Sequence, residues 1–129
     1  MASLVVNTGL ANATAAWHAY TSRVKFIGWG TGSGQTATST DLATAASESR
    51  TDGTSSQQTT NTTSDTFRVT GTITATGTRA ITEVATFDAA GTGNPPSGGN
   101  MGVYGDHSVI NLASGDSIQY TVDVVLDQA

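Results

Sequence analysis

The sequence contains no cysteine and a single lysine, Lys25. Without cysteine, neither a disulfide framework nor a thiolate metal site can form, so extra stability has to come from packing or oligomerisation. The five basic residues are scattered among ten acidic ones, and the formal net charge is −5. Because binding to nucleic-acid phosphate needs clustered Lys and Arg, this balance argues against a nucleic-acid partner.

Charge of either sign is scarce, since charged residues make up 12% of the chain and apolar residues 36%. The surface is therefore neutral and polar, rich in Thr, Ser and Gly, which is typical of β-proteins and outward-facing structural proteins. A chain of 129 residues fits one domain, here spanning 1–129, with a modest core.

A long hydrophobic run is also missing. The first residues, MASLVVNTGLANATAAW, have neither a basic n-region nor a long apolar stretch. This segment predicts neither a signal peptide nor a membrane span. We therefore expect a soluble product, made in the cytoplasm, without a membrane partner.

The clearest pattern that is present covers 65–77, DTFRVTGTITATG. Apolar residues and Gly alternate there with a series of mostly threonines that includes Thr70, Thr72 and Thr74. Successive side chains of a strand point to opposite faces, so the pattern predicts a strand with one buried apolar face and one threonine face. The β-branched residues favour the same structure.

Other segments are assigned by the same criteria. One short amphipathic helix is expected over 10–18, with Asn7 or Thr8 as its N-cap, after a short strand at 3–6. The segment 36–49 is interpreted as a covering loop or a single helical turn. The polar segment 50–64 resembles a linker but could equally form an exposed edge strand that pairs with another chain.

Further strands are expected at 23–29, 79–89, 101–104, 108–112 and 118–126, with a long loop over 89–100. The turn at Gly77-Thr78 predicts a hairpin between 65–77 and 79–89, the second strand carrying a bulge or being covered on both faces. Short antiparallel strands with frequent turns indicate a mainly-β fold, an antiparallel β-sandwich of jelly-roll-like arrangement with one short N-terminal helix.

Residues for catalysis are sparse. Asp106, His107 and Ser108 are the residue types of a catalytic triad, but neighbours in a strand face opposite sides and cannot form a relay. The aspartates lack calcium-loop spacing, and the glycines at 28–34 lack the lysine of a phosphate loop. A glycosidase-like carboxylate pair and an isopeptide bond at Lys25 stay open as alternatives. We expect that the protein is not an enzyme and that it binds no cofactor and no metal ion.

Two tryptophans, Trp17 and Trp29, allow two interpretations. Their aromatic faces could stack on sugars as a carbohydrate platform, or they could anchor the core of a domain that has few aromatic residues. The second interpretation is favoured by composition, because aromatic residues make up only 6% of the chain.

Six stretches, taken together and in order, resemble a family of small Thr/Gly-rich β-structural virion proteins of tailed bacteriophages. They are VNTGLA (6–11), KFIGWGTGSG (25–34), TDLATAASE (40–48), RTDGTSS (50–56), DTFRVTGTITATGTRAITEVATFDA (65–89) and INLASGDSIQYTV (110–122). The chain departs from that pattern at Ala85-Thr86. The resemblance implies a structural role and transfers no catalytic residue.

Within that family, the resemblance implies a head decoration or cement protein that binds the assembled capsid, expected as a homotrimer in the virion. Its partners would be the major capsid protein or other virion proteins, contacted through the N-terminal segment and 50–64. The alternative is a tail-fibre or tail-tip module that contacts the host surface and binds a glycan. The candidate contact residues are Trp29, Thr70, Thr72, Thr74, Asn94, Pro95, Pro96 and Tyr104.

Overall fold

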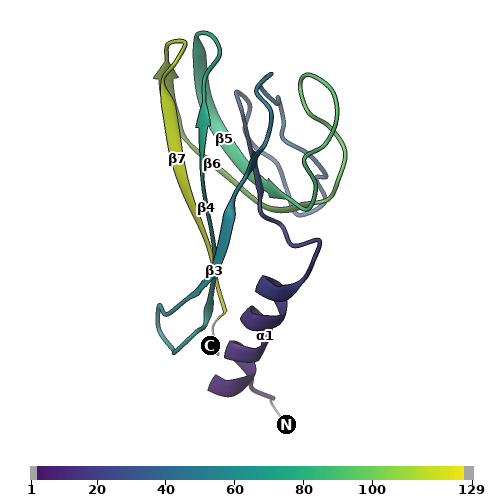
Figure 1. Ribbon diagram of the computed structural model, residues 1–129, viewed down its shortest axis with the longest axis vertical. Helices are drawn as coiled ribbons and strands as arrows, with labels where there is room; N and C mark the ends of the chain where they lie inside the picture. Colours follow the sequence, from purple (N-terminus) through teal and green to yellow (C-terminus); the bar gives the residue numbers. More distant parts are fainter. Residues whose placement is uncertain (1–2, 127–129) are drawn as a thin grey trace.

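The computed structural model describes residues 3–126. Helix α1 (Asn7–Ala19) comes first in the chain, and seven strands follow it (Figure 1). The strands are β1 (Phe26–Gly30), β2 (Thr51–Asp52), β3 (Thr54–Gln58), β4 (Thr66–Thr74), β5 (Arg79–Phe87), β6 (Met101–Leu112) and β7 (Ser117–Val125).

The strands form two antiparallel sheets that pack as a sandwich. The four-stranded sheet, sheet A, has the order β2-β1-β5-β6, and the three-stranded sheet, sheet B, has the order β3-β4-β7. The expected mainly-β sandwich with one N-terminal helix is confirmed. The strand order does not show a jelly roll.

The core lies between the inner faces of the two sheets. Phe67, Val69 and Ile73 of β4 are buried there, against Ile27 and Trp29 of β1. The alternation predicted for 65–77 is confirmed, because the apolar positions of β4 face this core while Thr72 and Thr74 are exposed.

The predicted hairpin between 65–77 and 79–89 is wrong. β4 pairs with β3 and β7, whereas β5 pairs with β1 and β6, so the two consecutive strands belong to different sheets. Ile73 and Ile81 are both buried in the same core. The turn after β4 therefore crosses from one sheet to the other, which lets both apolar faces pack against each other.

The helix is longer than the predicted 10–18. Its N-cap is Val6, without a side-chain cap bond, and 3–6 lies in no strand, so the expected caps and strand are wrong. α1 covers the part of the inner face of sheet B that sheet A does not reach (Figure 1). The ring of Trp17 stacks on Phe67 with 4.8 Å between centroids.

Of the remaining predicted segments, some are confirmed and others are corrected by the structure. The segment 50–64 contains β2 and β3, so its edge-strand interpretation is confirmed, and 36–49 is a covering loop. The two short strands expected at 101–104 and 108–112 are one strand, β6. Its pairing with β5 shifts register between Ile81 and Glu83, which leaves 107–109 of β6 opposite Thr82, so the extra residues lie in β6 and not in 79–89, where the sequence predicted a bulge.

The two sides of the sandwich differ in the length of the connection between the sheets. On one side a single residue, Gly53, separates β2 from β3, so the chain passes directly from sheet A to sheet B. A Cβ atom at Gly53 would lie 2.6 Å from the carbonyl oxygen of Lys25, so only glycine fits this corner. On the other side, the edge strands β6 and β7 are joined by the turn at 113–116, just as the edge strands β2 and β3 are joined at Gly53.

Candidate contact surface

Two of the residues expected to contact a partner are buried. Trp29 is 2% exposed, so its ring is a core anchor, and Pro96 shares a small internal cavity with Trp29 and Arg50. The expectation that these two residues contact a partner is therefore wrong for this fold. Trp29 is buried because its side chain packs in the core cluster that also contains Ile27 and Phe67.

The threonine series lies on the outer face of sheet B. Thr72 and Thr74 are exposed and Thr70 is half-buried. The hydroxyl of Thr74 lies 2.6 Å from that of Ser117, and Arg68 forms a bidentate ion pair with Asp123 at 2.7 and 2.9 Å. The face is thus mainly hydroxyl groups with one neutralised ion pair, and within residues 3–126 no other element covers it.

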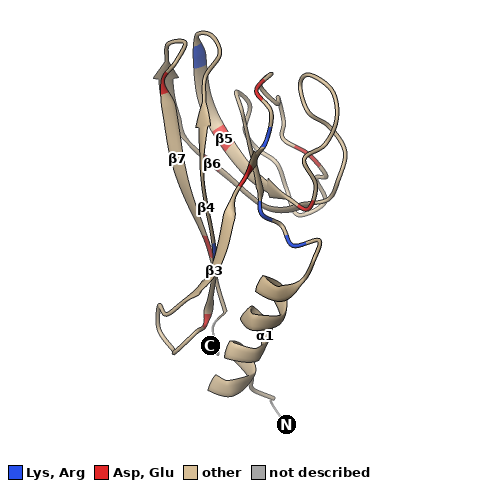
Figure 2. Cartoon of the chain, in the orientation of Figure 1, with Lys and Arg blue, Asp and Glu red and all other residues tan. Residues whose placement is uncertain are grey.

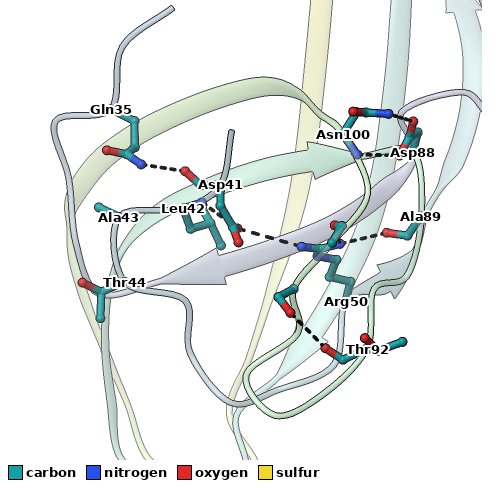
Figure 3. Close-up of polar contacts among 12 residues, drawn as sticks. Gln35, Asp41, Leu42, Ala43, Thr44, Arg50, Asp88, Ala89, Thr92 and Asn100 are labelled. Carbon is teal, nitrogen blue, oxygen red and sulfur yellow. Dashed lines mark hydrogen bonds and ion pairs between the residues drawn. The ribbon is translucent and has the colours of Figure 1, made fainter. Parts of the chain in front are cut away.

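Asn94 and Pro95 are exposed at the tip of the loop 88–100, which Arg50 holds against the domain (Figure 3). The Arg50 guanidinium donates to the carbonyl oxygens of Ala89 at 3.0 Å and Gly98 at 2.8 Å. Burial lowers the pKa of Arg50, and the charges of nearby carboxylates oppose that shift. The loop is therefore anchored at both ends, and its tip projects from a fixed base.

A second anchor closes the same loop. The Asp88 carboxylate accepts hydrogen bonds from the backbone N–H of Asn100 at 2.7 Å and from its side-chain amide at 2.8 Å. These bonds hold the pKa of Asp88 below its ordinary value. Figure 3 shows the Asp88–Asn100 pair and Arg50 on the same loop end of the sandwich. No sequence pattern pointed to either anchor, because neither belongs to a motif.

Tyr104 lies in a hollow of about 320 Å³ between the segment 35–39 and the start of β6. Its hydroxyl donates to the carboxylate of Glu83 at 2.9 Å. Burial, followed by this bond and the Glu83 charge, raises the pKa of Tyr104 to about 12. The ring is therefore fixed in orientation, and the hydroxyl stays protonated at neutral pH.

Glu83 is the acceptor that seats the covering loop on sheet A. Its carboxylate is fully buried and accepts three backbone N–H groups, from Gly32 at 3.1 Å, Ala43 at 2.9 Å and Thr44 at 2.8 Å. With the hydroxyl of Tyr104, it has four donors. The alternation of β5 indicates only that Glu83 shares a face with Ile81, and from the sequence that position looks unsuited to a charge.

Several exposed apolar side chains lie on the two edge strands β6 and β7 and in the segment before α1. Val109 and Ile110 of β6 and Val125 of β7 are 52%, 39% and 39% exposed. Leu4 and Val6 in the segment before α1 are 69% and 59% exposed. Figure 2 shows that α1, which follows this segment, contains no Lys, Arg, Asp or Glu.

No catalytic relay forms at Asp106, His107 and Ser108. The His107 ring lies 3.0 Å from the Tyr120 hydroxyl of β7, whereas the Asp106 carboxylate accepts the backbone N–H of Gly34. Among residues 3–126, no three His, Asp or Glu side chains are grouped so as to hold a metal ion. Lys25 forms an ion pair with Asp52 at 2.7 Å.

In comparisons with known proteins, no family model matches the chain and no curated protein matches it. Within the described part of the chain, no helix is long and apolar enough to cross a membrane.

Proposed function

We propose that this protein is a structural subunit of a tailed-bacteriophage particle, a decoration or cement protein that binds the assembled capsid and stabilises it. This class of protein is inferred from the resemblance of the strand and turn sequences to those of small β-structural virion proteins. The observation that carries the proposal is the long, regularly paired edge strand β7 of sheet B. Edge strands β2 and β3 lie on the side of Gly53, and edge strands β6 and β7 lie on the other side, where β7 is longer than β3.

The edge of β7 is open to another chain. Its nine residues, 117–125, pair with β4 without a register shift and contain no Pro, Lys or Arg. Proteins that avoid edge-to-edge association usually place such residues, or a bulge, on an exposed edge strand. The single charge on β7, Asp123, is neutralised by Arg68. An edge of this kind suits a strand that is covered in the finished assembly.

The apolar side chains near that edge support the same role. The core-facing residues of β7, such as Tyr120 and Val122, are only half-buried, and Val109 of β6 and Val125 at the end of β7 are exposed. The segment before α1 adds Leu4 and Val6 as a second apolar contact. We propose a homotrimer that bridges capsid subunits through these surfaces, because several weak contacts made together give strong attachment.

Imaging of purified virions at subnanometre resolution tests the location. Density for this domain on the outer surface of the head is expected. Density on the tail alone would overturn the cement proposal and favour the alternative, a tail-fibre or tail-tip module that contacts the host surface.

A pair of variants tests the edge itself. Thr121→Lys places a charge on the edge strand β7, and Ala80→Lys places the same charge at an exposed position of β5, which pairs there with β6 and does not belong to the β7 edge. With heads that lack this protein, co-sedimentation of Thr121→Lys should fall at least tenfold while Ala80→Lys attaches normally. Equal attachment of the two variants would contradict the role of β7.

A further inference from the structure

We infer that the hollow beside Tyr104 is a binding site for one neutral sugar unit. It is about 320 Å³ in volume and lies between the covering loop and the start of β6, on the loop end of the sandwich. Ligand sites in proteins begin at about 300 Å³, so a hollow of this size accommodates a single ring-sized ligand.

The lining is neutral and hydrogen-bonding. The residues that form it carry no formal charge, and their polar side chains are those of Gln35, Thr36, Ser39 and Tyr104. The nearby carboxylate of Glu83 is buried and already has four donors. The net charge of −5 disfavours an anionic ligand, and the lining offers no carboxylate to a cation. Hydroxyl groups are the ligand chemistry that this lining can satisfy.

The polar groups are held in place before a ligand arrives. The side-chain N–H of Gln35 donates to the carbonyl oxygen of Asp41 at 2.6 Å, and Figure 3 shows the amide oxygen turned away from that bond. The hydroxyl oxygen of Ser39 accepts the backbone N–H of Thr36 at 2.9 Å, so its own O–H remains available as a donor. Fixed donors and acceptors lose little conformational entropy on binding.

Tyr104 supplies the apolar part of the site. Its hydroxyl is engaged with Glu83, so the ring, beside Met101, is what remains for a ligand. An aromatic ring with an apolar body and a fixed polar end suits a pyranose, which presents C–H groups on one face and hydroxyls at its rim. A nucleotide would need a second stacking partner for its base and charged groups for its phosphate, which the lining does not provide.

This inference goes beyond the structural role and does not depend on the location of the protein in a particle. Many copies on one particle would turn a weak affinity for single sugars into useful attachment to a polysaccharide. Because the isolated protein can be tested for binding, failure of the sugar site and failure of the cement proposal are distinguishable.

The test is titration of the isolated full chain, followed by amide NMR, with the methyl glycosides of glucose, galactose and N-acetylglucosamine. Saturable binding to at least one of them, with a Kd on the order of 1 to 10 mM, is expected, with shifts confined to 35–39 and 101–104. Absence of saturation at 100 mM, or shifts located elsewhere, would overturn the inference. Tighter binding of a nucleoside or an acidic sugar would also overturn it.

Matched variants locate the binding. Ala37→Trp fills the hollow from an exposed loop position, and Thr40→Trp places the same side chain on that loop outside the lining. Ala37→Trp should weaken binding at least tenfold, Ser39→Ala about threefold, and Thr40→Trp should leave it unchanged. Equal binding by the two Trp variants, both folded by amide NMR, would show that the ligand lies elsewhere.

Discussion

The guanidinium of Arg50 lies 3.5 Å from the centroid of the Phe87 ring, at the end of β5. The same group donates to two carbonyl oxygens of the loop 88–100, so one side chain joins the covering loop, sheet A and the loop 88–100. The exposed tip with Asn94 and Pro95 depends on this junction for its position, although Arg50 itself is only 8% exposed.

Arg50→Lys should destabilise the domain by about 2–3 kcal/mol, because an ammonium group cannot keep the planar stack and both hydrogen bonds. Amide hydrogen exchange should accelerate within 89–98. Arg68→Lys, at the more exposed ion pair with Asp123, is the control and should shift the denaturant midpoint far less. Similar shifts in the two variants would show that Arg50 does not hold the loop.

Glu83→Gln should cost about 1–3 kcal/mol of unfolding free energy. Whichever way the new amide turns, its NH₂ group faces at least one backbone N–H, and that buried donor loses its acceptor. Denaturant unfolding measures the change. Asp52→Asn, which alters a carboxylate with a 60% exposed side chain, is the control, and a loss as large there would contradict the argument.

The fold class follows from residues whose pattern is local. The alternation of Phe67, Val69 and Ile73 fixes one buried face by the two-residue period of a strand, and the same period defines β7. Which strand lies beside which is not local, and this is why the expected hairpin was wrong. A tight turn and a sheet-to-sheet crossing both need a short polar segment, so Gly77-Thr78 fits either.

The candidate surface was less predictable than the fold. Asn94 and Pro95 are exposed, because loop residues near glycines tend to lie at a surface, and Tyr104 is half-buried. Burial of Trp29 depends on its packing in the core cluster between the two sheets, which no local pattern encodes. Glu83 and Arg50 were missed for a related reason, since their partners are backbone groups that become close only after the loops have packed.

Acid should destabilise the domain partly through Asp65. Burial acts to raise its pKa, but the N–H groups of 60–62 and the Thr66 hydroxyl outweigh burial and hold the pKa well below the ordinary value. A depressed folded-state pKa gives stability that is fully present above the unfolded pKa of about 3.9 and is lost as pH falls toward the folded value.

The unfolding midpoint should therefore fall between about pH 5 and pH 2, and Asp65→Asn should make that fall shallower while lowering stability at pH 7. Thermal unfolding followed by circular dichroism across this range measures both effects. An unchanged acid slope in Asp65→Asn would assign the effect to other carboxylates, of which Asp88 and Asp123 also have lowered pKa values.

Docking of α1 should depend on one buried hydroxyl. Thr14 donates to the carbonyl oxygen of Ser64 at 2.6 Å and lies 2.9 Å from the side-chain nitrogen of Gln57. Thr14→Val keeps the shape but leaves those two groups without this partner, which should cost about 1–3 kcal/mol. Thr8→Val, at an exposed position of the same helix, is the control. Chemical denaturation measures the free energy of unfolding, and equal losses in both variants would contradict this role of Thr14.

The place of β4 between β3 and β7 has a consequence for synthesis. Its residues 66–74 pair on one side with 54–58, which precede them closely, and on the other with 117–125, which are translated about fifty residues later. During translation β4 can gain its first neighbour early, but its second edge stays unpaired until residues 117–125 have emerged. Contacts so distant in sequence form slowly. The nascent chain therefore exposes the unpaired, threonine-rich edge of β4 until β7 has been synthesised.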